Sequence, residues 1–216
     1  MNIKGVIFDL DGTLIDSMNC WEQVDAQFLR ENSVDPPPGV SDIVKTMSIT
    51  MACRYFISEF GIKMTPQAIA DRIEQMVYDK YANEIPLKPG VIQLLDHLDS
   101  RGIPYGIATA TYNSLACAVT KRLAIYDRLK FLFTCLDAGT DKNDPEFFRI
   151  AAEKLGCLPG EALAVDDALH CIQAGVKAGV NTAVVYEKTA DSDWNDACLC
   201  ADINIRSLVE LTDIIK

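Results

Sequence analysis

The stretch from Gly5 to Ser17 constrains the fold of this chain more than any other segment. It opens with the short run Gly5 to Phe8, and an apolar run of this kind fits a strand buried on both faces of a parallel sheet. Asp9 and Asp11 follow at once, and Gly12 then permits a sharp turn. Both carboxylates are therefore expected at the carboxyl end of the strand, where open α/β sheets bind their ligands.

The two neighbouring aspartates pose an electrostatic problem. Two ionised carboxylates so close together repel each other and lose hydration when they are partly buried, so a cation or a shared proton must compensate. An Asp-Gly pair alone would more often be an ordinary turn. Here the full D-x-D-G-T pattern of Asp9 to Thr13 follows a buried strand directly, and we interpret it as a site for a divalent metal ion and a ligand.

The rest of the chain divides into a helical segment and an alternating one. From Met18 to about Ile85 apolar residues recur at helical spacing without a strand pattern, and Thr65-Pro66 is typical of a helix start. Beyond Leu87, strands are expected over residues 103–109, 131–136, 162–165, 181–186 and 202–205. Helices are expected from 91 to about 101 and over 113–124, 145–155, 168–178 and 206–215.

This alternation predicts the α/β class: a doubly wound, Rossmann-like parallel sheet with helices on both faces. We expect a core domain made of residues 1–16 and 87–216, with a small all-helical cap domain inserted at residues 17–86. At 216 residues the chain is long enough for one full domain and a smaller insertion.

Composition excludes some partners and favours one compartment. A net charge of −11 disfavours binding to nucleic acid and to anionic membranes, because both require a basic surface. No apolar run reaches transmembrane length, and the first strand begins too early to leave room for a signal peptide. The eight cysteines are scattered rather than arranged as a disulfide framework. We expect a cytoplasmic protein with reduced thiols, as a monomer or weak homodimer.

Polar residues also follow later strands. Thr109 ends the second expected strand, and its hydroxyl, with the backbone amides of the Ala110 turn, suits a phosphate. Lys142 lies in the loop before a helix that begins at Pro145, and a lysine is a point charge suited to a phosphate oxygen.

A second acidic pair follows the fourth expected strand. Asp166 and Asp167 are adjacent there, and together with Asp9 they offer the oxygen ligands that Mg²⁺ prefers. His170, in the first turn of the next helix, is expected to be solvated and without a catalytic role.

Four motifs in this order, with a helical insertion after the first, resemble the haloacid dehalogenase-like hydrolase superfamily. The resemblance is to subfamily I with a helical C1 cap, the phosphoglycolate phosphatase and β-phosphoglucomutase-like branch. It implies a Mg²⁺-dependent phosphatase that hydrolyses a small phosphorylated metabolite through an aspartyl-phosphate intermediate. Asp141 and Asn143 depart from the usual third motif, in which a glycine and a proline flank the lysine.

The resemblance also implies roles for individual residues. Asp9 would be the nucleophile and Asp11 the general acid and base, while Thr109 and Lys142 would hold the phosphate oxygens. Haloacid dehalogenases work without the second aspartate, so Asp11 favours phosphate chemistry. The expected ligands of Mg²⁺ are Asp9, Asp166, Asp167 and, through its carbonyl, Asp11.

Several alternatives stay open. A sugar phosphomutase of the β-phosphoglucomutase type is the main one, but such mutases usually carry a histidine and an arginine where this chain has Trp21 and Ile49. A receiver domain would lack the D-x-D-G-T motif and the insertion, and a silent binding protein would not need every motif residue. In the insertion, Trp21, Lys45 and Ser48 are candidates for substrate contact.

Overall fold

The structure of the chain is a computed structural model that describes residues 1–44 and 47–216, apart from the side chains of Glu22 and Asp42. Its centre is a six-stranded sheet in which every neighbouring pair of strands is parallel. The strands are β1 (Gly5–Phe8), β2 (Tyr105–Thr109), β3 (Leu132–Thr134), β4 (Ala162–Asp166), β5 (Asn181–Val185) and β6 (Ile203–Ile205).

The strand order is β3-β2-β1-β4-β5-β6, so the chain builds outward from β1 in both directions. Strand β1 pairs with β2 on one side and with β4 on the other, with Phe8 opposite Ile107 and Val165. In doubly wound sheets the order reverses at such a point, and the crevice that opens there at the carboxyl ends of the strands binds ligands. The expected doubly wound parallel sheet is confirmed.

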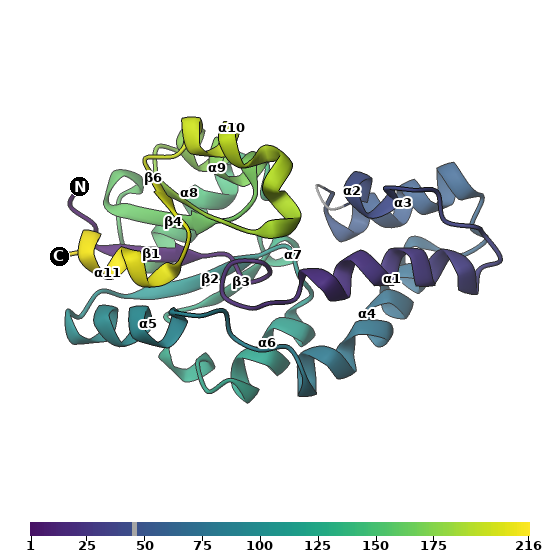
Figure 1. Ribbon diagram of the computed structural model, residues 1–216, viewed down its shortest axis with the longest axis horizontal. Helices are drawn as coiled ribbons and strands as arrows, with labels where there is room; N and C mark the ends of the chain where they lie inside the picture. The colour runs from purple at the N-terminus through teal and green to yellow at the C-terminus, as the bar shows by residue number, and fades with distance from the viewer. Residues whose placement is uncertain (45–46) are drawn as a thin grey trace.

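Helices cover both faces of the sheet (Figure 1). One face carries α5 (Val91–Ser100), α6 (Asn113–Arg122) and α11 (Leu211–Ile214), and the other carries α8 (Pro145–Leu155) and α9 (Leu169–Ala178), with α10 (Trp194–Cys200) beside α9. Side chains alternate between the faces, since Val6 and Phe8 join the α5 and α6 side of the core whereas Ile7 joins the α8 and α9 side.

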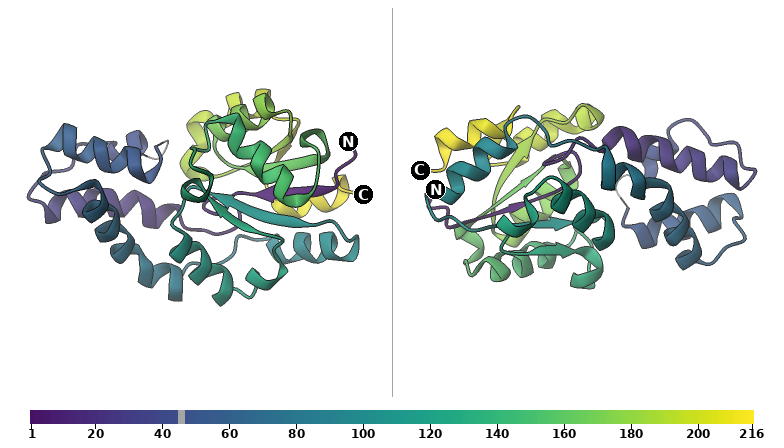
Figure 2. Two further views of the ribbon diagram at one scale, coloured as in Figure 1. Left: turned by 180° about the vertical axis from the view of Figure 1, so that it is seen from behind. Right: turned by 90° about the horizontal axis from the view of Figure 1, so that it is seen from below.

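Four helices lie between β1 and α5 and form a group beside the carboxyl end of the sheet (Figures 1 and 2). They are α1 (Met18–Glu31), α2 (Val40–Val44), α3 (Ile49–Phe60) and α4 (Pro66–Asn83), and we call them the helical insertion. Phe28 and Phe56 pack at its centre with ring centroids 5.4 Å apart. Thr65 caps α4 by accepting a hydrogen bond from the Ala68 amide at 3.2 Å, which confirms the predicted helix start.

Local hydrogen bonds correct two predicted boundaries. The strand expected over 131–136 ends at Thr134, because Thr134 and Asp137 cap each other and start the one-turn helix α7 (Cys135–Ala138). The helix expected over 206–215 is also shorter. Glu210 accepts hydrogen bonds from the amides of Arg206 and Ser207 at 2.9 and 2.8 Å, and a 3₁₀ turn at Leu208–Glu210 precedes α11.

Besides α7, helix α10 of the core was not predicted. Helix α10 follows a 3₁₀ segment at Lys188–Asp193, and the only residue that it buries completely is Ala197. A helix with so little buried surface leaves a weak periodic signal in the sequence. Two further 3₁₀ turns lie at Tyr126–Arg128 and Pro159–Glu161.

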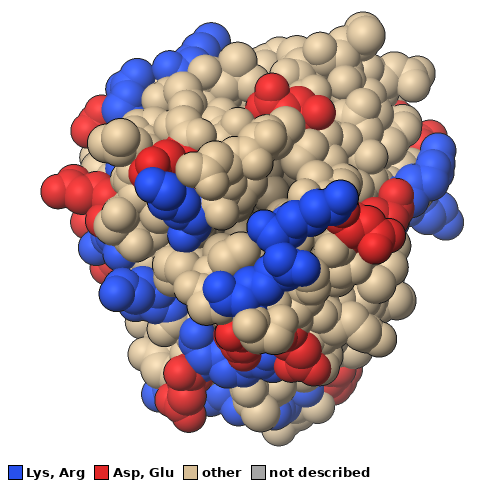
Figure 3. Space-filling model, turned by 90° about the vertical axis from the view of Figure 1, so that its left-hand side faces the viewer, with Lys and Arg blue, Asp and Glu red and all other residues tan. Residues whose placement is uncertain are grey.

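The surface agrees with the acidic composition. Within the described part of the chain, no helix combines the length and apolarity needed to cross a membrane. The end of the core that lies away from the insertion shows lysine and arginine side chains interspersed with aspartate and glutamate (Figure 3). This face therefore presents no uniform basic field of the kind that attracts polyanions.

Gly106 in β2 allows a test of packing against the sheet. A Cβ atom at this position would lie 2.5 to 2.6 Å from three atoms of the Phe131 ring, so Gly106→Ala should lower the free energy of unfolding by about 1–3 kcal/mol, the usual cost of overpacking. Urea denaturation followed by circular dichroism measures the change. Gly160→Ala is the control, because its nearest non-neighbour atom would be 3.9 Å away. Equal stabilities of the two variants would contradict this account.

Candidate active site

The carboxyl ends of the central strands and the helical insertion enclose a cavity of about 210 Å³. Eight residues singled out in the sequence line it: Asp9, Asp11, Trp21, Thr109, Ala110, Lys142, Asp166 and Asp167. Lys45, expected to contact substrate, lies outside the described residues. Ser48 does not line the cavity and instead caps α3, accepting a hydrogen bond from the Met51 amide at 3.4 Å.

Three carboxylates converge at one end of the cavity. Asp9 follows β1. Asp166 is the last residue of β4 and Asp167 follows it, and β4 is hydrogen-bonded to β1. Each offers one oxygen, and these three atoms all lie within 4.8 Å of one another. The Asp9 amide also donates to the Val165 carbonyl at 2.9 Å, which ties the two strand ends together. Neighbouring parallel strands thus bring Asp9 and the second acidic pair to one point.

Lys142 lies between two of these carboxylates. Its ammonium donates to Asp9 Oδ1 at 2.6 Å and to Asp166 Oδ2 at 2.5 Å, and all three side chains are buried. Burial alone would lower the pKa of the Lys142 amine, but the facing carboxylates of Asp166 and Asp9 outweigh burial and raise the pKa above its ordinary value. Lys142 is therefore a fixed positive charge within the acidic cluster.

The charge of Lys142 does not neutralise the whole cluster. Burial raises the pKa of Asp9 to about 7, with Lys142 opposing the rise and Asp166 adding to it. Burial, followed by the charges of Asp166 and Asp9, also raises the pKa of Asp167 well above its ordinary value. Three carboxylates facing one ammonium leave an excess of negative charge, and an Mg²⁺ ion with oxygen ligands fits such a donor set.

Gly12 lets Asp167 approach the first strand. Its φ of +80° lies in the left-handed region, and a Cβ atom there would come within 2.8 Å of Asp167 Oδ2. The next residue, Thr13, donates its hydroxyl to Asp167 Oδ1 at 3.3 Å. The turn after β1 therefore holds Asp167 in position. A larger residue at position 12 would leave no room for the Asp167 carboxylate.

Asp11 faces the helical insertion and accepts hydrogen bonds from four side chains. Ser17 Oγ donates to Oδ1 at 2.6 Å, Tyr81 OH and Trp21 Nε1 donate to the same oxygen, and Thr111 Oγ1 donates to Oδ2 at 2.5 Å. Trp21 Nε1 also donates to Tyr81 OH at 2.6 Å. Burial, with the charge of Asp11 next, raises the pKa of Tyr81 well above its ordinary value, so the phenol stays a donor.

Three of these donors do not stand out in the sequence. Thr111 lies two residues beyond Thr109, and its place at the same strand end could have identified it. Ser17 ends the opening stretch, where the sequence pattern indicates only a boundary. Tyr81 lies 70 residues from Asp11 near the end of α4, and no local pattern connects the two.

Thr109 and His170 form two further parts of the cavity wall. The Thr109 hydroxyl oxygen accepts a hydrogen bond from the Thr111 amide at 3.1 Å, which leaves its hydrogen for a ligand oxygen. His170 was expected to be solvated, but it is partly buried and lines the cavity. Burial lowers the pKa of His170 below its ordinary value. A neutral imidazole adds no positive charge to this wall.

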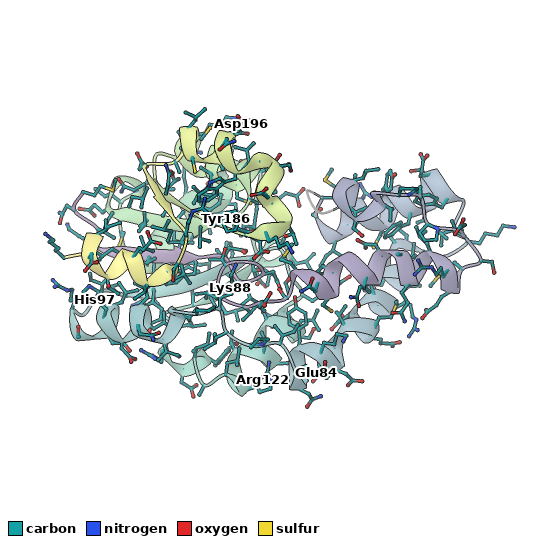
Figure 4. The ribbon with its side chains drawn as sticks, in the orientation of Figure 1. Glu84, Lys88, His97, Arg122, Tyr186 and Asp196 are labelled. Atoms are coloured by element: carbon teal, nitrogen blue, oxygen red, sulfur yellow. The ribbon has the colours of Figure 1, made fainter. Side chains whose placement is uncertain are left out.

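Lys88 joins the chain that leaves the insertion to the turn after β1. It lies near the centre of the molecule, between the sheet and the insertion (Figure 4), and donates to the Gly12 carbonyl at 2.6 Å and to Glu187 Oε2 at 2.5 Å. Arg122 of α6 donates to the carbonyls of Tyr81 and Ile85 at the end of α4, close to Glu84 (Figure 4). The C-terminal end of the insertion is thus tied to the core beside the site.

The raised pKa of Asp9 predicts a pH dependence of stability. Between pH 3.8, the ordinary pKa of an aspartate, and about pH 7, the folded protein holds a proton on Asp9 that the unfolded chain has released. The free energy of unfolding therefore falls as pH rises through this range, by up to about 1.4 kcal/mol per pH unit. Urea denaturation of metal-free protein between pH 4 and 8 should show a shallower fall for Asp9→Asn than for the wild type.

Two controls accompany this measurement. Asp71→Asn changes an exposed carboxyl group of α4 and should keep the wild-type slope. Added Mg²⁺ should stabilise the wild type at pH 8 more than at pH 5, because the ion binds ionised carboxylates. Identical pH profiles for Asp9→Asn and the wild type would contradict the assignment of the titration to this site.

Known proteins share both the sequence and the fold. A family model described as haloacid dehalogenase-like hydrolase matches residues 6–185. The chain is 29% identical over 215 residues to hexitol phosphatase A of Escherichia coli (strain K12), covering 98% of this chain and 94% of that protein.

Two other similar proteins carry different names. The chain is 29% identical over 227 residues to β-phosphoglucomutase of Bacillus subtilis (strain 168), covering 97% of this chain and 92% of that protein. The crystal structure of CbbY from Rhodobacter sphaeroides in complex with xylulose-(1,5)bisphosphate has the same fold, with a TM-score of 0.85, 20% identity, and coverage of 97% and 96% of the two chains. The match to the family over most of the chain, on top of the site geometry, establishes that this protein belongs to the haloacid dehalogenase-like hydrolases.

Proposed function

We propose that this protein is a Mg²⁺-dependent phosphatase that hydrolyses the phosphate monoester of a small metabolite. The observation that carries the proposal is the convergence of Asp9 with Lys142 and the Asp166-Asp167 pair at the end of β1. A nucleophilic carboxylate, a fixed ammonium and a set of oxygen ligands for a metal are the groups that phosphoryl transfer requires. The similarity to a hexitol phosphatase supports the same class of reaction.

The proposed reaction has two steps. Asp9 attacks phosphorus and forms an aspartyl-phosphate, while the bond to the leaving oxygen breaks and that oxygen takes a proton from Asp11. Asp11 then removes a proton from a water molecule, which attacks phosphorus and breaks the bond to Asp9. Asp11 follows Asp9 by two residues and shares the cavity with it, so both can reach one bound phosphate.

Other groups would hold the phosphate. The Thr109 hydroxyl and the amide of Ala110 would donate to its oxygens, and the Lys142 ammonium would lie beside Asp9 and the incoming group. Asp9, Asp166 and Asp167, with the Asp11 carbonyl, would hold Mg²⁺. When bound, the ion supplies positive charge that offsets the repulsion between the nucleophile and the phosphate.

We propose that residues 17–86 are a cap domain over this site, and that residues 1–16 and 87–216 are the core. The two segments that would connect the domains run side by side. The Asp16 amide donates to the Pro86 carbonyl at 3.0 Å, and the Lys88 amide donates to the Leu14 carbonyl at 2.9 Å. A paired connection of this kind can act as a hinge. Trp21 would then form part of the ceiling above the bound phosphate.

A sugar phosphomutase is the alternative, and the similarity to a β-phosphoglucomutase favours it. Such an enzyme must hold a second phosphate in the same cavity. Among the described residues that line the cavity, Lys142 is the one lysine or arginine, and it already pairs with Asp9 and Asp166. Trp21 and Ile49 also stand where such mutases usually carry a histidine and an arginine, so the phosphatase is the better supported reaction. Incubation with hexose 1-phosphates separates the two, since a mutase yields the isomer rather than free phosphate.

We further propose the cytoplasm as the compartment, because all eight cysteines are free thiols, as in a reducing environment. The partner is a small phosphorylated metabolite rather than a nucleic acid or a membrane, and we propose a monomer or weak homodimer.

Replacement of the nucleophile tests the proposal directly. Asp9→Asn should lower the turnover of p-nitrophenyl phosphate with Mg²⁺ by more than about a thousandfold, because the amide oxygen is a poor nucleophile. Asp16→Asn is the matched control, since this exposed carboxylate belongs to the same stretch of chain and should leave turnover unchanged. Substantial activity in Asp9→Asn would refute the mechanism, and a phosphate-release screen of the wild type with and without Mg²⁺ tests the ion.

Tyr81→Phe tests the link between the insertion and Asp11. Removing the phenol oxygen deletes one hydrogen bond to Asp11 and leaves the ring in place, so kcat should fall by about tenfold with little change in KM. Tyr78→Phe serves as control, because that side chain lies on the same helix and is 44% exposed. A wild-type kcat in Tyr81→Phe would show that Asp11 is positioned without this contact.

A further inference from the structure

The cavity changes character away from the carboxylate cluster. Its wall on the side of the helical insertion is largely apolar and includes Met18, Val44, Met47, Ile49, Ala52 and Ile73. Among the described residues one carboxyl group, that of Asp25, interrupts this wall, and Ser41 lies beside it. The part of a substrate that carries the phosphate and the part that is released would therefore meet different surroundings.

Asp25 is directed to the cavity by its place on α1. Met18, Trp21 and Asp25 follow one another at intervals of three and four residues, which puts them on one face of the helix, and all three line the cavity. The Asp25 side chain is 9% exposed and is hydrogen-bonded to Ser41 of α2. No lysine or arginine among the described residues forms an ion pair with it.

Burying an ionised carboxyl group in this position costs free energy, because the charge loses its hydration. Burial raises the pKa of Asp25 to about 7, and the hydrogen bond from Ser41 only partly opposes the rise. If Asp25 served only to join α1 to α2, an asparagine could make the same hydrogen bond without a charge to desolvate. A carboxylate has a further use in this position, because it accepts strong charge-assisted hydrogen bonds from a ligand.

The chemistry of the wall limits what that ligand can carry. A second phosphate or carboxylate close to Asp25 would be repelled by its carboxylate. An ammonium group would lose the hydration of its charge in this apolar environment. A hydroxyl group loses far less hydration free energy and still donates a hydrogen bond to the carboxylate.

We infer that Asp25, supported by Ser41, is a specificity-determining residue that accepts a hydrogen bond from a hydroxyl group on the leaving group, so that the substrates are monophosphate esters of small hydroxylated, otherwise uncharged carbon compounds. The inference rests on the proposed phosphatase function. It names polyol and sugar monophosphates as the substrate class.

Matched pairs of substrates test this inference. Each pair consists of an alkyl phosphate and the same ester with a terminal hydroxyl group, for chains of two to six carbons, and kcat/KM is measured from phosphate release with Mg²⁺. The wild type should prefer the hydroxylated ester by about tenfold or more at the chain length that reaches Asp25. In Asp25→Leu this ratio should fall to one or below, whereas Asp79→Leu, which changes an exposed carboxylate of α4, should keep it.

The ratio within one variant does not depend on how much of the enzyme is folded. Asp25→Asn, which keeps the size of the side chain and loses its charge, should give an intermediate ratio and serves if Asp25→Leu yields too little protein. Equal rates for both esters in the wild type at every length, an unchanged ratio in Asp25→Leu, or a preference for the aminoalkyl over the hydroxyalkyl ester would each overturn the inference. Failure of the wild type to hydrolyse any phosphate monoester would instead refute the proposed function.

Discussion

The ammonium of Lys142 between Asp9 and Asp166 is the interaction on which the rest of the site depends. Three buried carboxylates within 4.8 Å of one another would repel strongly without a positive charge among them. One ammonium offsets part of this repulsion and leaves enough negative charge for a divalent ion. The same balance of charge within the folded chain fits the metal ion and the phosphate of the proposed function.

The sheet order explains how this balance arises. Strand β1 pairs with β2 and with β4, so the residues that follow these three strands meet at one edge. Lys142 reaches the same edge from the loop that precedes α8. Four segments that are distant in the chain thus each contribute charged or polar groups, and the compact turn at Gly12 lets Asp167 approach the end of β1.

The helical insertion adds a second layer to the site. It supplies the donors Ser17, Trp21 and Tyr81, which orient Asp11, and it supplies the apolar wall with Asp25. Arg122 holds its C-terminal end against the core, and Lys88, which follows that end, binds the turn after β1. In the proposed mechanism the core would carry the groups for chemistry on phosphorus, while the insertion would orient Asp11 and contact the leaving group.

The sequence by itself determined the sheet and the core of the site. Apolar runs end in Asp9, Thr109 and Asp166, and because parallel strands align their carboxyl ends, such residues meet wherever the sheet forms. Boundaries set by hydrogen bonds between side chain and backbone, as at Thr134, were less accurately predicted. Only the tertiary structure decided that Tyr81 reaches Asp11 and that Asp25 faces the cavity, because these contacts depend on how the helices of the insertion pack, and no local pattern records the packing of distant helices.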